Sequence, residues 1–595
     1  MASTIMSARD LEFLLHEWLD VESLTSRKRY AEHSRETFDA LLSLCEQLAT
    51  EHFAPHNRKA DLEEPRFDGT TVHLIPEVKA AVDRFNQADL LSLSMDESVG
   101  GMQLPDVVRQ ACMAWFYAAN LGTSAYPMLT VGNASLLLAH GSPEQIEMFV
   151  QPMLQGRFHG TMALSEPHAG SNLADITTRA EPQEDGTYRI FGRKMWISGG
   201  DHELGENIVH LVLAKLPDAP AGTRGISLFI VPKFLVGEDG SVGERNDVVL
   251  AGINHKLGNR GTVNTAPVFG DGAFTPGGRA GAVGYLVGEP HRGLSYMFHM
   301  MNGARLAVGL GATALGYTAY LKSVEYARSR PQGRAFGTSD PTAPQVPIIE
   351  HTDVRRMLLT QKAYAEGALA LNLYCALLVD EQRTAESATS REAATQLLDV
   401  LTPIAKSWPS QWCQEGTSLA IQVLGGAGYT RDYDVEQHWR DQRLNPIHEG
   451  THGIQALDLL GRKVLAGPGL SVLASRISST VRRATEVGGE AASLAAELSA
   501  WVDRLGEVTL GLAGLGDPAK VTANATVYLE AAGHLVISWL WLEQFLAASG
   551  EGDFYEGKRQ AARYFFRWEL PKIGPMLDLL ASGDTTTLEM RSEWF

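Results

Sequence analysis

The order of helical and extended segments along the chain constrains its fold more than any other feature of the sequence. Residues 8–154 place apolar side chains at intervals of three and four positions, which predicts helices. Strands are predicted next, because β-branched and aromatic residues bounded by Gly, Pro and Asp fill 188–198, 207–214 and 226–231. The helical periodicity then returns over 294–328, 353–382 and 392–424. A strand-rich block between two helical blocks is not the alternating pattern of a doubly wound sheet.

The predicted fold is therefore mostly α with an inserted β domain. A chain of 595 residues, 44% of them hydrophobic, can bury several cores. Gly467, Pro468 and Gly469 interrupt the helical pattern and predict a linker before the last helices. We expect an N-terminal helical domain at 1–155, a middle β domain at 156–280, a C-terminal helical bundle at 281–465 and an additional helical domain at 466–595.

Composition and charge exclude several classes of protein. The formal net charge is -19, whereas proteins that bind nucleic-acid phosphates carry clustered Lys and Arg, so no nucleic-acid partner is expected. The four cysteines lie far apart without a CxxC pair, which favours a reducing cytoplasm over a disulfide framework or a zinc knuckle. The N-terminus lacks a signal-peptide pattern, and no uninterrupted apolar run reaches the ~18 residues that span a bilayer. We expect a cytoplasmic protein without a transmembrane segment.

Two turns in the predicted β domain could contact a ligand. The turn at 162–173 contains Gly170 and Ser171, whose N–H groups and hydroxyl could meet polar ligand atoms, and the turn at 194–200 offers the flat face of Trp196. Turns of this composition are common, and a Trp usually belongs to a core, so residue chemistry alone leaves both interpretations open. No GxGxxG follows a predicted strand, and for Gly309, Gly311 and Gly316 close helix packing is the preferred interpretation.

These turns resemble the signature of the acyl-CoA dehydrogenase family. The matching residues are Leu164-Ser165-Glu166-Pro167, Ala169-Gly170-Ser171 and Lys194-Met195-Trp196-Ile197-Ser198, with His168 where the family usually has glycine. In the family the two turns hold the isoalloxazine ring of FAD, so the resemblance implies FAD as cofactor. The implied flavin contacts are Met162, Leu164, Ser165, Gly170, Ser171, Trp196, Ile197 and Ser198. Ser171 is also an implied substrate contact.

Further segments resemble the family in the same order along the chain. The paired glycines at 97–102 and the Lys-x-Gly-x-Arg at 256–262 match family turns, although each alone could be a surface turn. Asn302-Gly303-Ala304-Arg305 resembles the family's Asp-x-Gly-Arg, which makes Asn302 and Arg305 implied substrate contacts. A planar guanidinium can fix a polar ligand oxygen, but an ordinary salt bridge explains Arg305 equally well.

The resemblance implies a second group of flavin contacts in the C-terminal bundle. Arg330 ends a predicted helix, as does the family arginine that pairs with the FAD diphosphate, and Arg334 is a second possibility. Gln422 and Gly426 belong to a glycine-rich turn that in the family commonly receives the FAD of the neighbouring subunit. The resemblance therefore also implies a homodimer.

The segment Ile447-His448-Glu449-Gly450-Thr451 resembles the family's Tyr-Glu-Gly-Thr, whose glutamate is the catalytic base. Abstracting the α-proton of a thioester needs a stronger base than a carboxylate of pKa near 4.3, and burial beside an acyl chain would raise the pKa of Glu449. In the family, the flavin ribityl hydroxyl and the backbone N–H of the glutamate stabilise the enolate-like charge on the thioester carbonyl. Gly450 is an implied substrate contact and Thr451 an implied flavin contact, while Gly453 replaces a flavin-contacting glutamine.

The same residues also spell HExxH, the motif of zinc metallopeptidases. Zinc binding would need His448 and His452 on one face of a continuous helix, whereas Pro446 and Gly450 predict a loop, with Thr451 as the cap of the next helix. We therefore expect no metal site, and the zinc metallopeptidase is a remote alternative.

The resemblance covers residues 41–463 and implies FAD-dependent α,β-dehydrogenation of a fatty acyl-CoA to a trans-2-enoyl-CoA, with medium-to-long chains preferred. It implies electron-transfer flavoprotein as the electron acceptor. The alternatives are an acyl-CoA oxidase that uses oxygen, a methylthiopropanoyl-CoA dehydrogenase, and a relative that keeps flavin without catalysis. The resemblance also implies the acyl-CoA dehydrogenase-like fold, in which the middle β domain is barrel-like and the C-terminal bundle has four helices. The helical extension resembles that of the larger bacterial dehydrogenases.

Overall fold

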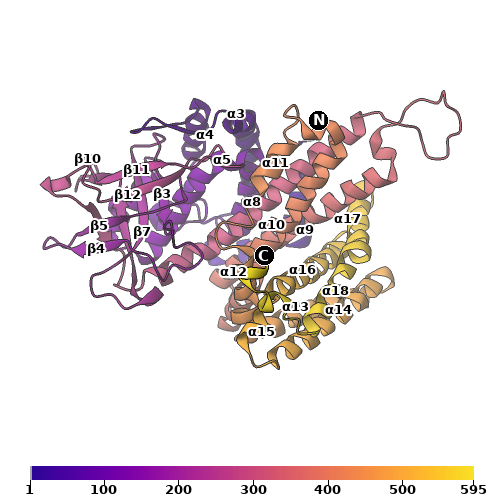
Figure 1. Ribbon diagram of the computed structural model, residues 1–595. Coiled ribbons are helices and arrows are strands. Elements are labelled where there is room, and N and C mark those ends of the chain that lie inside the picture. Colours follow the sequence, from indigo (N-terminus) through magenta and orange to yellow (C-terminus); the bar gives the residue numbers. More distant parts are fainter. Residues whose placement is uncertain (1–2) are drawn as a thin grey trace. The chain divides into compact units, whose positions relative to one another are not determined.

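The computed structural model describes residues 3–595, which form two compact units (Figure 1). Unit 1 comprises Met1–Leu42, Pro105–Ala118 and Arg305–Phe595, and unit 2 comprises Ser43–Leu104 and Ala119–Ala304. The fold is mostly α with an inserted β region, as the order of periodicities predicts. The division into four domains stays a prediction.

Unit 2 contains a barrel-like arrangement of strands. Strand β4 (Arg179–Pro182) pairs with β5 (Tyr188–Arg193), β5 with β13 (Ala282–Leu286), β13 with β8 (Ile226–Pro232) and β8 with β7 (Asn207–Lys215). Arg179 then pairs with Lys215, which joins β4 to β7 and closes the ring. The sheet extends outward through β3 (Phe158–Ala163), β11 (Val248–Ile253), β12 (Asn264–Phe269) and β6 (Ile197–Ser198).

Strand β7 is buried on both faces, which explains its continuous run of apolar residues. Val212 and Ala214 face a core shared with the other barrel strands, whereas Leu211 and Leu213 belong to a second core that includes Leu137. Leu137 lies in α5 (Asp106–His140), a helix interrupted by non-helical dihedrals at Asn120. A strand covered on both sides loses the alternation of polar and apolar residues that marks a half-exposed strand.

Two departures from the predicted elements have local causes. The predicted helical region 8–154 contains a small hairpin of β1 (Arg66–Phe67) and β2 (Val72–His73), whose turn is fixed by Asp68 accepting hydrogen bonds from the N–H groups of the next turn residues. The predicted strand at 188–198 divides into β5 and β6, because Trp196 has a positive φ of 68° that no strand accommodates.

Further α-helices of unit 2 come before strand β3. They are α3 (Asn57–Leu62), α4 (Pro76–Gln87), α6 (Pro143–Gln145) and α7 (Gln151–Leu154), with a short hairpin of β9 (Phe234–Val236) and β10 (Val242–Arg245) later in the chain.

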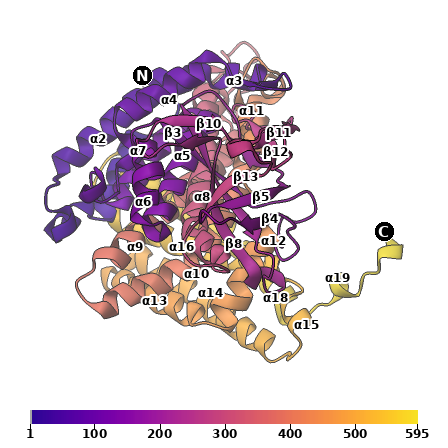
Figure 2. The same cartoon turned by 90° about the vertical axis from the view of Figure 1, so that its left-hand side faces the viewer.

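Unit 1 is a helical unit around one large core. The predicted long helices are confirmed as α8 (Gly293–Ser329), α9 (Thr352–Thr384) and α10 (Ala388–Leu424), although the first residues of α8 belong to unit 2. The extension adds α13 (Gly469–Val487), α14 (Gly489–Ala513), α16 (Ala525–Ala547), α17 (Asp553–Tyr564) and α18 (Ile573–Ala581). Beyond α18 the chain leads through α19 (Thr586–Glu589) and away from the packed helices (Figure 2).

Glycines allow α8 and α10 to approach each other closely. A Cβ on Gly309 would lie 2.0 Å from the carbonyl oxygen of Ala405, and one on Gly316 would lie 2.7 Å from Cβ of Cys413. The interpretation of these two glycines as helix-packing residues is therefore confirmed.

Helix α16 is a long and strongly apolar helix of unit 1. It is long and apolar enough to cross a bilayer by length and composition, but 83% of its apolar window is buried among the described residues. Its buried Trp539 and Trp541 belong to the same core as residues of α9 and α10, so α16 is a central core helix of the unit.

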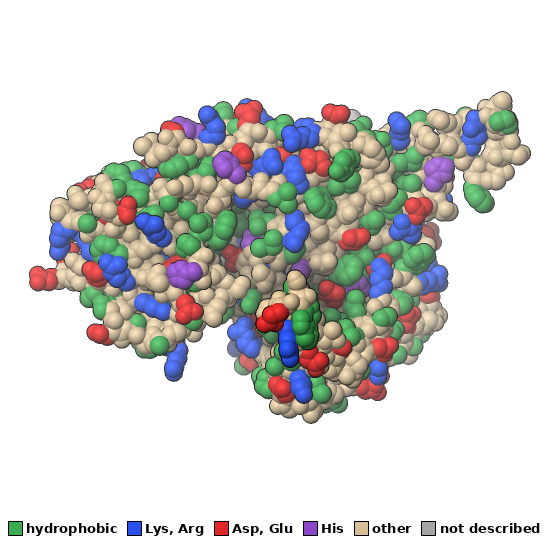
Figure 3. Space-filling model, in the orientation of Figure 1, with side chains coloured by type: hydrophobic (Ala, Val, Ile, Leu, Met, Phe, Trp, Pro, Cys, Tyr) green, Lys and Arg blue, Asp and Glu red, His purple; other side chains and the backbone are tan. Residues whose placement is uncertain are grey.

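On the face drawn in Figure 3, acidic and basic side chains are interspersed over the surface.

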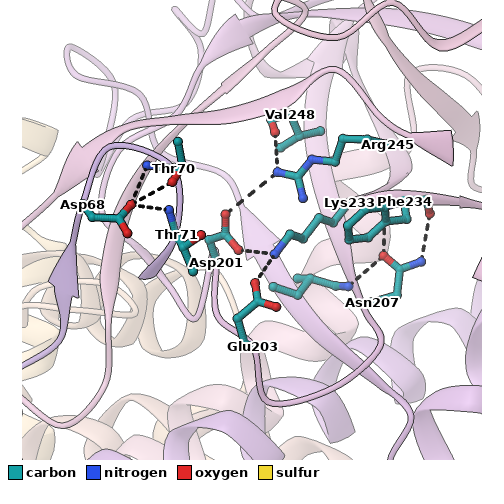
Figure 4. A network of polar contacts seen from close by, with 11 residues as sticks. Asp68, Thr70, Thr71, Asp201, Glu203, Asn207, Lys233, Phe234, Arg245 and Val248 are labelled. Carbon is teal, nitrogen blue, oxygen red and sulfur yellow. Dashed lines mark hydrogen bonds and ion pairs between the residues drawn. The ribbon is translucent and has the colours of Figure 1, made fainter. Parts of the chain in front are cut away.

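A buried ion pair lies next to three buried histidines in unit 2. Lys233 Nζ contacts Asp201 Oδ1 at 2.6 Å and Glu203 Oε1 at 3.1 Å (Figure 4). Burial lowers the pKa of His159 to about 4 and of His210 to about 3, and it lowers the pKa of His202 well below its usual value. The charge of Lys233 adds to the shifts of His202 and His210, so all three rings stay neutral near pH 7.

We expect unit 2 to lose stability in mild acid. Because the folded pKa values are depressed, the unfolded chain binds protons first as the pH falls below about 6.5, and stability declines from there toward pH 4. At pH 5 each histidine should cost up to about 2 kcal/mol of unfolding free energy relative to pH 7. Urea titrations at both pH values should show a smaller decline for His159→Phe than for the wild type. The exposed control His255→Gln should match the wild type, and equal declines for wild type and His159→Phe would contradict the assignment.

Candidate active site

Glu449 lies in a short loop of unit 1 between α11 (Val435–Gln442) and α12 (His452–Leu457). The carbonyl of Leu444 turns the chain by accepting hydrogen bonds from the N–H groups of Ile447 at 2.8 Å and His448 at 3.2 Å. Thr451 ends the loop as the N-cap of α12. The loop and the cap predicted from Pro446, Gly450 and Thr451 are both confirmed.

This loop separates the two histidines of the HExxH sequence. His448 precedes the cap, where its Nε2 contacts Asn445 Oδ1 at 3.2 Å, whereas His452 is the first residue of α12. The two rings do not lie on one face of a continuous helix, which is the arrangement that an HExxH zinc site requires. Among residues 3–595, no group of three or more His, Cys, Asp or Glu side chains could hold a metal ion.

Two consecutive positive φ angles shape the backbone at the predicted base. Gly450 has φ of 86°, which glycine adopts readily, but Glu449 has φ of 52°, a left-handed conformation that costs a non-glycine residue roughly 1–2 kcal/mol. A side chain at position 450 would also collide with Gln455, because a Cβ there would lie 2.5 Å from its Nε2. Strain of this kind persists only where surrounding contacts hold the backbone in place.

Two buried side chains supply those contacts. Lys406 Nζ donates a hydrogen bond to the carbonyl of Gly450 at 2.7 Å. Gln455 Nε2 donates to the carbonyl of Glu449 at 3.1 Å and to that of Gly450 at 3.4 Å. Both side chains belong to residues with 0% exposure, so the two carbonyls are bound from the interior of the unit.

The electrostatic surroundings of Glu449 are suited to a general base. Burial raises the pKa of its carboxyl above the usual value, while the positive charges of Lys406 and Arg305 act in the opposite direction. Burial also lowers the pKa of Lys406, to about 7. A carboxylate with a raised pKa is a stronger base than a solvated one, which is the property that proton abstraction from a weakly acidic C–H requires.

Arg305 forms a buried salt bridge in the same region. Its Nη1 lies 2.9 Å from Oδ2 of Asp458, and Arg462 Nη2 contacts the other carboxylate oxygen at 2.8 Å. Arg305 is 4% exposed, so its guanidinium acts on the base from within the unit. Asn302, the other implied substrate contact of that segment, is exposed on α8.

In unit 2, hydrogen bonds join the two turns that the resemblance assigns to the flavin. The N–H of Met195 donates to the carbonyl of Ser165 at 3.0 Å, and Lys194 Nζ donates to the carbonyl of Leu164 at the same distance. Lys194 also pairs with Glu166 at 3.1 Å, in a salt bridge with almost no exposure of either side chain. The turns that begin at Leu164 and Lys194 are therefore fixed against each other.

Glu166 anchors the first turn through four further hydrogen bonds. Its two carboxylate oxygens accept from the N–H and hydroxyl groups of Thr177 and Thr178 at 2.6–3.0 Å. Although burial acts to raise the pKa of Glu166, Lys194 and these donors hold it at about 2. Gly170 and Ser171 are exposed beyond this anchor, and a Cβ on Gly170 would meet nothing within 4 Å.

Trp196 has an unusual conformation for an aromatic residue. Its φ is positive and its side chain is 62% exposed, while Ile197 beside it is buried. An exposed indole on a strained backbone, fixed to the Ser165 turn through Met195, fits a binding surface for a planar ring better than a core position. Met162, Leu164 and Ser198, the other implied contacts of the ring, are partly buried. These residues fit a flavin.

Arg330, Gln422 and Gly426 occupy another part of unit 1. Arg330 follows the end of α8, and Gln422 lies in the last turn of α10, whose C-terminal residues pack in one core with Ala327 and Ile348. All three are exposed, and a Cβ on Gly426 would meet nothing within 4 Å. Arg334, the second possibility, is exposed in the loop between α8 and α9 that projects in Figure 1 and donates to the carbonyl of Ala343 at 2.8 Å.

Sequence reasoning did not identify Lys406, Gln455 or Asp458. Gln455 and Asp458 come four and seven positions after Thr451, so they lie on the same face of the helix as this cap residue. On that face Gln455 meets the loop and Asp458 meets Arg305. Lys406 has the clearest sequence signal, because it is the one charged residue in the apolar stretch 400–408.

Family models match nearly the whole chain. The N-terminal, middle and C-terminal domains of acyl-CoA dehydrogenase match residues 35–157, 161–271 and 291–465. A model described as acetyl-CoA dehydrogenase C-terminal like matches residues 473–591, within the helical extension.

Relatives and a solved structure agree with these matches. The 3-methylmercaptopropionyl-CoA dehydrogenase of Ruegeria pomeroyi is 38% identical over 94% of both chains. The broad-specificity linear acyl-CoA dehydrogenase FadE5 of Mycobacterium tuberculosis is 34% identical over 98% of both chains. The structure of an acyl-CoA dehydrogenase from Bacillus anthracis complexed with FAD covers 98% of this chain and 95% of its own, with a TM-score of 0.74 and 18% identity. The chain therefore belongs to the acyl-CoA dehydrogenase family of flavin-dependent oxidoreductases.

Proposed function

We propose that this protein oxidises a straight-chain fatty acyl-CoA, with medium-to-long chains preferred, to the trans-2-enoyl-CoA, with FAD as its cofactor and Glu449 as the base. The observation that carries the proposal is the position of Glu449. Burial raises the pKa of the Glu449 carboxyl, and the backbone of the residue is strained. The carbonyls of Glu449 and Gly450 are bound by side chains from the interior of the unit. Such an arrangement costs stability and is expected where a residue acts on a ligand.

The reaction removes hydrogen from two adjacent carbons of the acyl chain. FAD, when bound, supplies the acceptor at N5 for the hydride from the β-carbon. Glu449 takes the proton from the α-carbon, and the N–H of Glu449 is a donor for the thioester carbonyl as negative charge develops on its oxygen. Gly450 is a proposed substrate contact and Thr451 a proposed flavin contact.

One group of proposed flavin contacts lies in unit 2 and another in unit 1. In unit 2, Trp196 offers a flat face, and Ser165, Ser171 and Ser198 offer hydroxyl groups. From unit 1, Arg330 has a charge complementary to the diphosphate, and Gln422 and Gly426 present polar backbone and side-chain groups. Arg305 and Asn302 remain proposed substrate contacts, although the salt bridge to Asp458 already uses one face of the Arg305 guanidinium.

The names of two relatives support the proposed choice of substrate. One of them is named for linear acyl-CoAs of broad specificity, which supports straight fatty acyl chains. Another is named for 3-methylmercaptopropionyl-CoA, whose short thioether chain is a second candidate here.

We further propose that the protein works in the cytoplasm as a homodimer and passes its electrons to an electron-transfer flavoprotein.

Reductive titration tests reaction and substrate class together. Anaerobic addition of straight acyl-CoAs of increasing length to the purified yellow holoenzyme should bleach the flavin, with medium-to-long chains giving the fastest phase. 3-Methylmercaptopropionyl-CoA belongs in the same series, and faster bleaching by it than by any straight chain would replace the preferred substrate. A protein that bound no flavin would overturn the proposal as a whole.

Glu449→Gln should retain FAD and lose proton abstraction. Replacing a general base typically removes a factor of 10²–10⁴, so the bleaching rate should fall by at least about 100-fold while the flavin spectrum is kept. Glu486→Gln, at an exposed position in α13, is the matched control and should bleach at the wild-type rate. Bleaching by Glu449→Gln at an undiminished rate would remove Glu449 from the role of base.

Reoxidation distinguishes a dehydrogenase from an oxidase. After reduction by substrate, the flavin should reoxidise slowly in air-saturated buffer and at least tenfold faster with electron-transfer flavoprotein or an artificial acceptor. Stoichiometric hydrogen peroxide, formed at the rate of turnover with oxygen alone, would instead identify an acyl-CoA oxidase.

A further inference from the structure

Lys406 is a buried lysine in the core of unit 1. It lies in α10 between Ala405 and Ser407, with 0% exposure, in a helix segment that also contributes Ile404 and Trp408 to the main core. A lysine is rarely fully buried unless its charge has a use or a partner, because desolvation of an ammonium group is costly. In the described part of the chain, no carboxylate forms a direct salt bridge with Lys406.

The direct contact of Lys406 is with the loop that carries Glu449. Its Nζ donates to the carbonyl of Gly450 at 2.7 Å, and the bond joins α10 to the residue that follows the proposed base. Gln455, one turn into α12, binds the same carbonyl from a different element. The ammonium group is therefore held beside the base without contacting its carboxylate oxygens directly.

Several other charged groups surround Lys406. From α8, Arg305 is near enough to lower the pKa of Lys406, but its charge is balanced by Asp458 at 2.9 Å. From α12, His452 has its pKa lowered to about 4 by burial and by the charges of Lys406 and Arg443, so its ring is neutral at pH 7. From the loop, Glu449 is the carboxylate that favours the charged form of Lys406. Lys406 and Glu449 thus balance each other.

This balance resolves a conflict at the proposed base. Burial beside an acyl chain strengthens Glu449 as a base, but burial alone also favours the protonated carboxyl, and a protonated carboxyl cannot accept the α-proton. The charged form of Lys406, which Glu449 favours in turn, favours the carboxylate without a direct hydrogen bond that would occupy its oxygens.

We propose that Lys406 is a positioning residue that keeps Glu449 ionised and holds its loop through the carbonyl of Gly450. This inference rests on the proposed function, because it assigns Lys406 its role through Glu449. No bond is made or broken at Lys406: when Glu449 takes the α-proton, its carboxyl becomes neutral and the ammonium remains protonated. The charge of Lys406 therefore acts on the base before the reaction.

The test compares variants that separate the charge from the hydrogen bond. Lys406→Met removes both, Lys406→Gln removes the charge and keeps an N–H donor, and Lys406→Arg keeps the charge. The readout is the bleaching rate at saturating acyl-CoA as a function of pH, measured anaerobically on holoenzyme. Lys463→Met, which removes a charge that pairs with Asp399 on the surface, is the matched control.

The expected result is a shift in the acidic limb of the profile. Without the charge, the pKa of Glu449 rises, so the midpoint should move up by about one pH unit in Lys406→Met and Lys406→Gln. It should stay in place in Lys406→Arg and Lys463→Met. Lys406→Met should also lose about tenfold in maximal rate relative to Lys406→Gln, because only the glutamine can still bind the Gly450 carbonyl.

Two outcomes would overturn the inference. Wild-type midpoints in both Lys406→Met and Lys406→Gln would show that Lys406 does not act on the ionisation of the base. If the two variants fail to fold, infrared difference spectra of the wild type against Glu449→Gln report the carboxyl directly, and a protonated Glu449 at the pH of fastest bleaching would contradict the inference. Failure of the proposed function itself is a different result, since Glu449→Gln would then turn over normally.

Discussion

The burial of α16 is the packing constraint on which the part of unit 1 around Glu449 depends. Its tryptophans lie in the core shared by α9, α10 and α12, and its residues Leu529 and Glu530 line a small hollow together with His452 and Ser407. His452 begins the helix that follows Glu449, and Ser407 follows Lys406. The C-terminal extension thus packs behind the proposed base and its lysine, which makes the extension a support for the site as well as an addition to the fold.

The packing behind the loop helps to hold its strained conformation. Glu449 takes a left-handed conformation, and the carbonyls of Glu449 and Gly450 are bound by Lys406 and Gln455 from two different helices. Because α10 and α12 are both fixed in the same core, those bonds resist relaxation of the loop to an ordinary turn. Unit 2 also has a strained backbone that buried contacts hold in place. There, Glu166 and Lys194 fix the turn that contains Trp196 against the neighbouring turn.

Periodicity and turn residues predicted most of the fold because they report on local constraints. The long helices and the position of the strands followed from spacing, and the loop at Glu449 followed from Pro446, Gly450 and the capping residue Thr451. The division of the strand at Trp196 and the ring closure between β4 and β7 could not be derived from the residue pattern, since they depend on contacts between segments distant in sequence, and only the family resemblance implied a barrel-like domain. The candidate flavin residues came from resemblance, because an exposed strained Trp and a buried core Trp have the same local sequence.

The contact that Lys406 makes in the candidate site could not be predicted from the sequence. A single lysine in an apolar helix indicates that something polar must face it, but the partner lies 44 residues away in the chain and is a backbone carbonyl, which has no sequence signature. The acid in the motif is visible, whereas the charge that sets its ionisation is not. An acidic residue recognised by motif therefore gives the proposed base, and the buried lysine proposed to act on it has to be found in the packing of the surrounding helices.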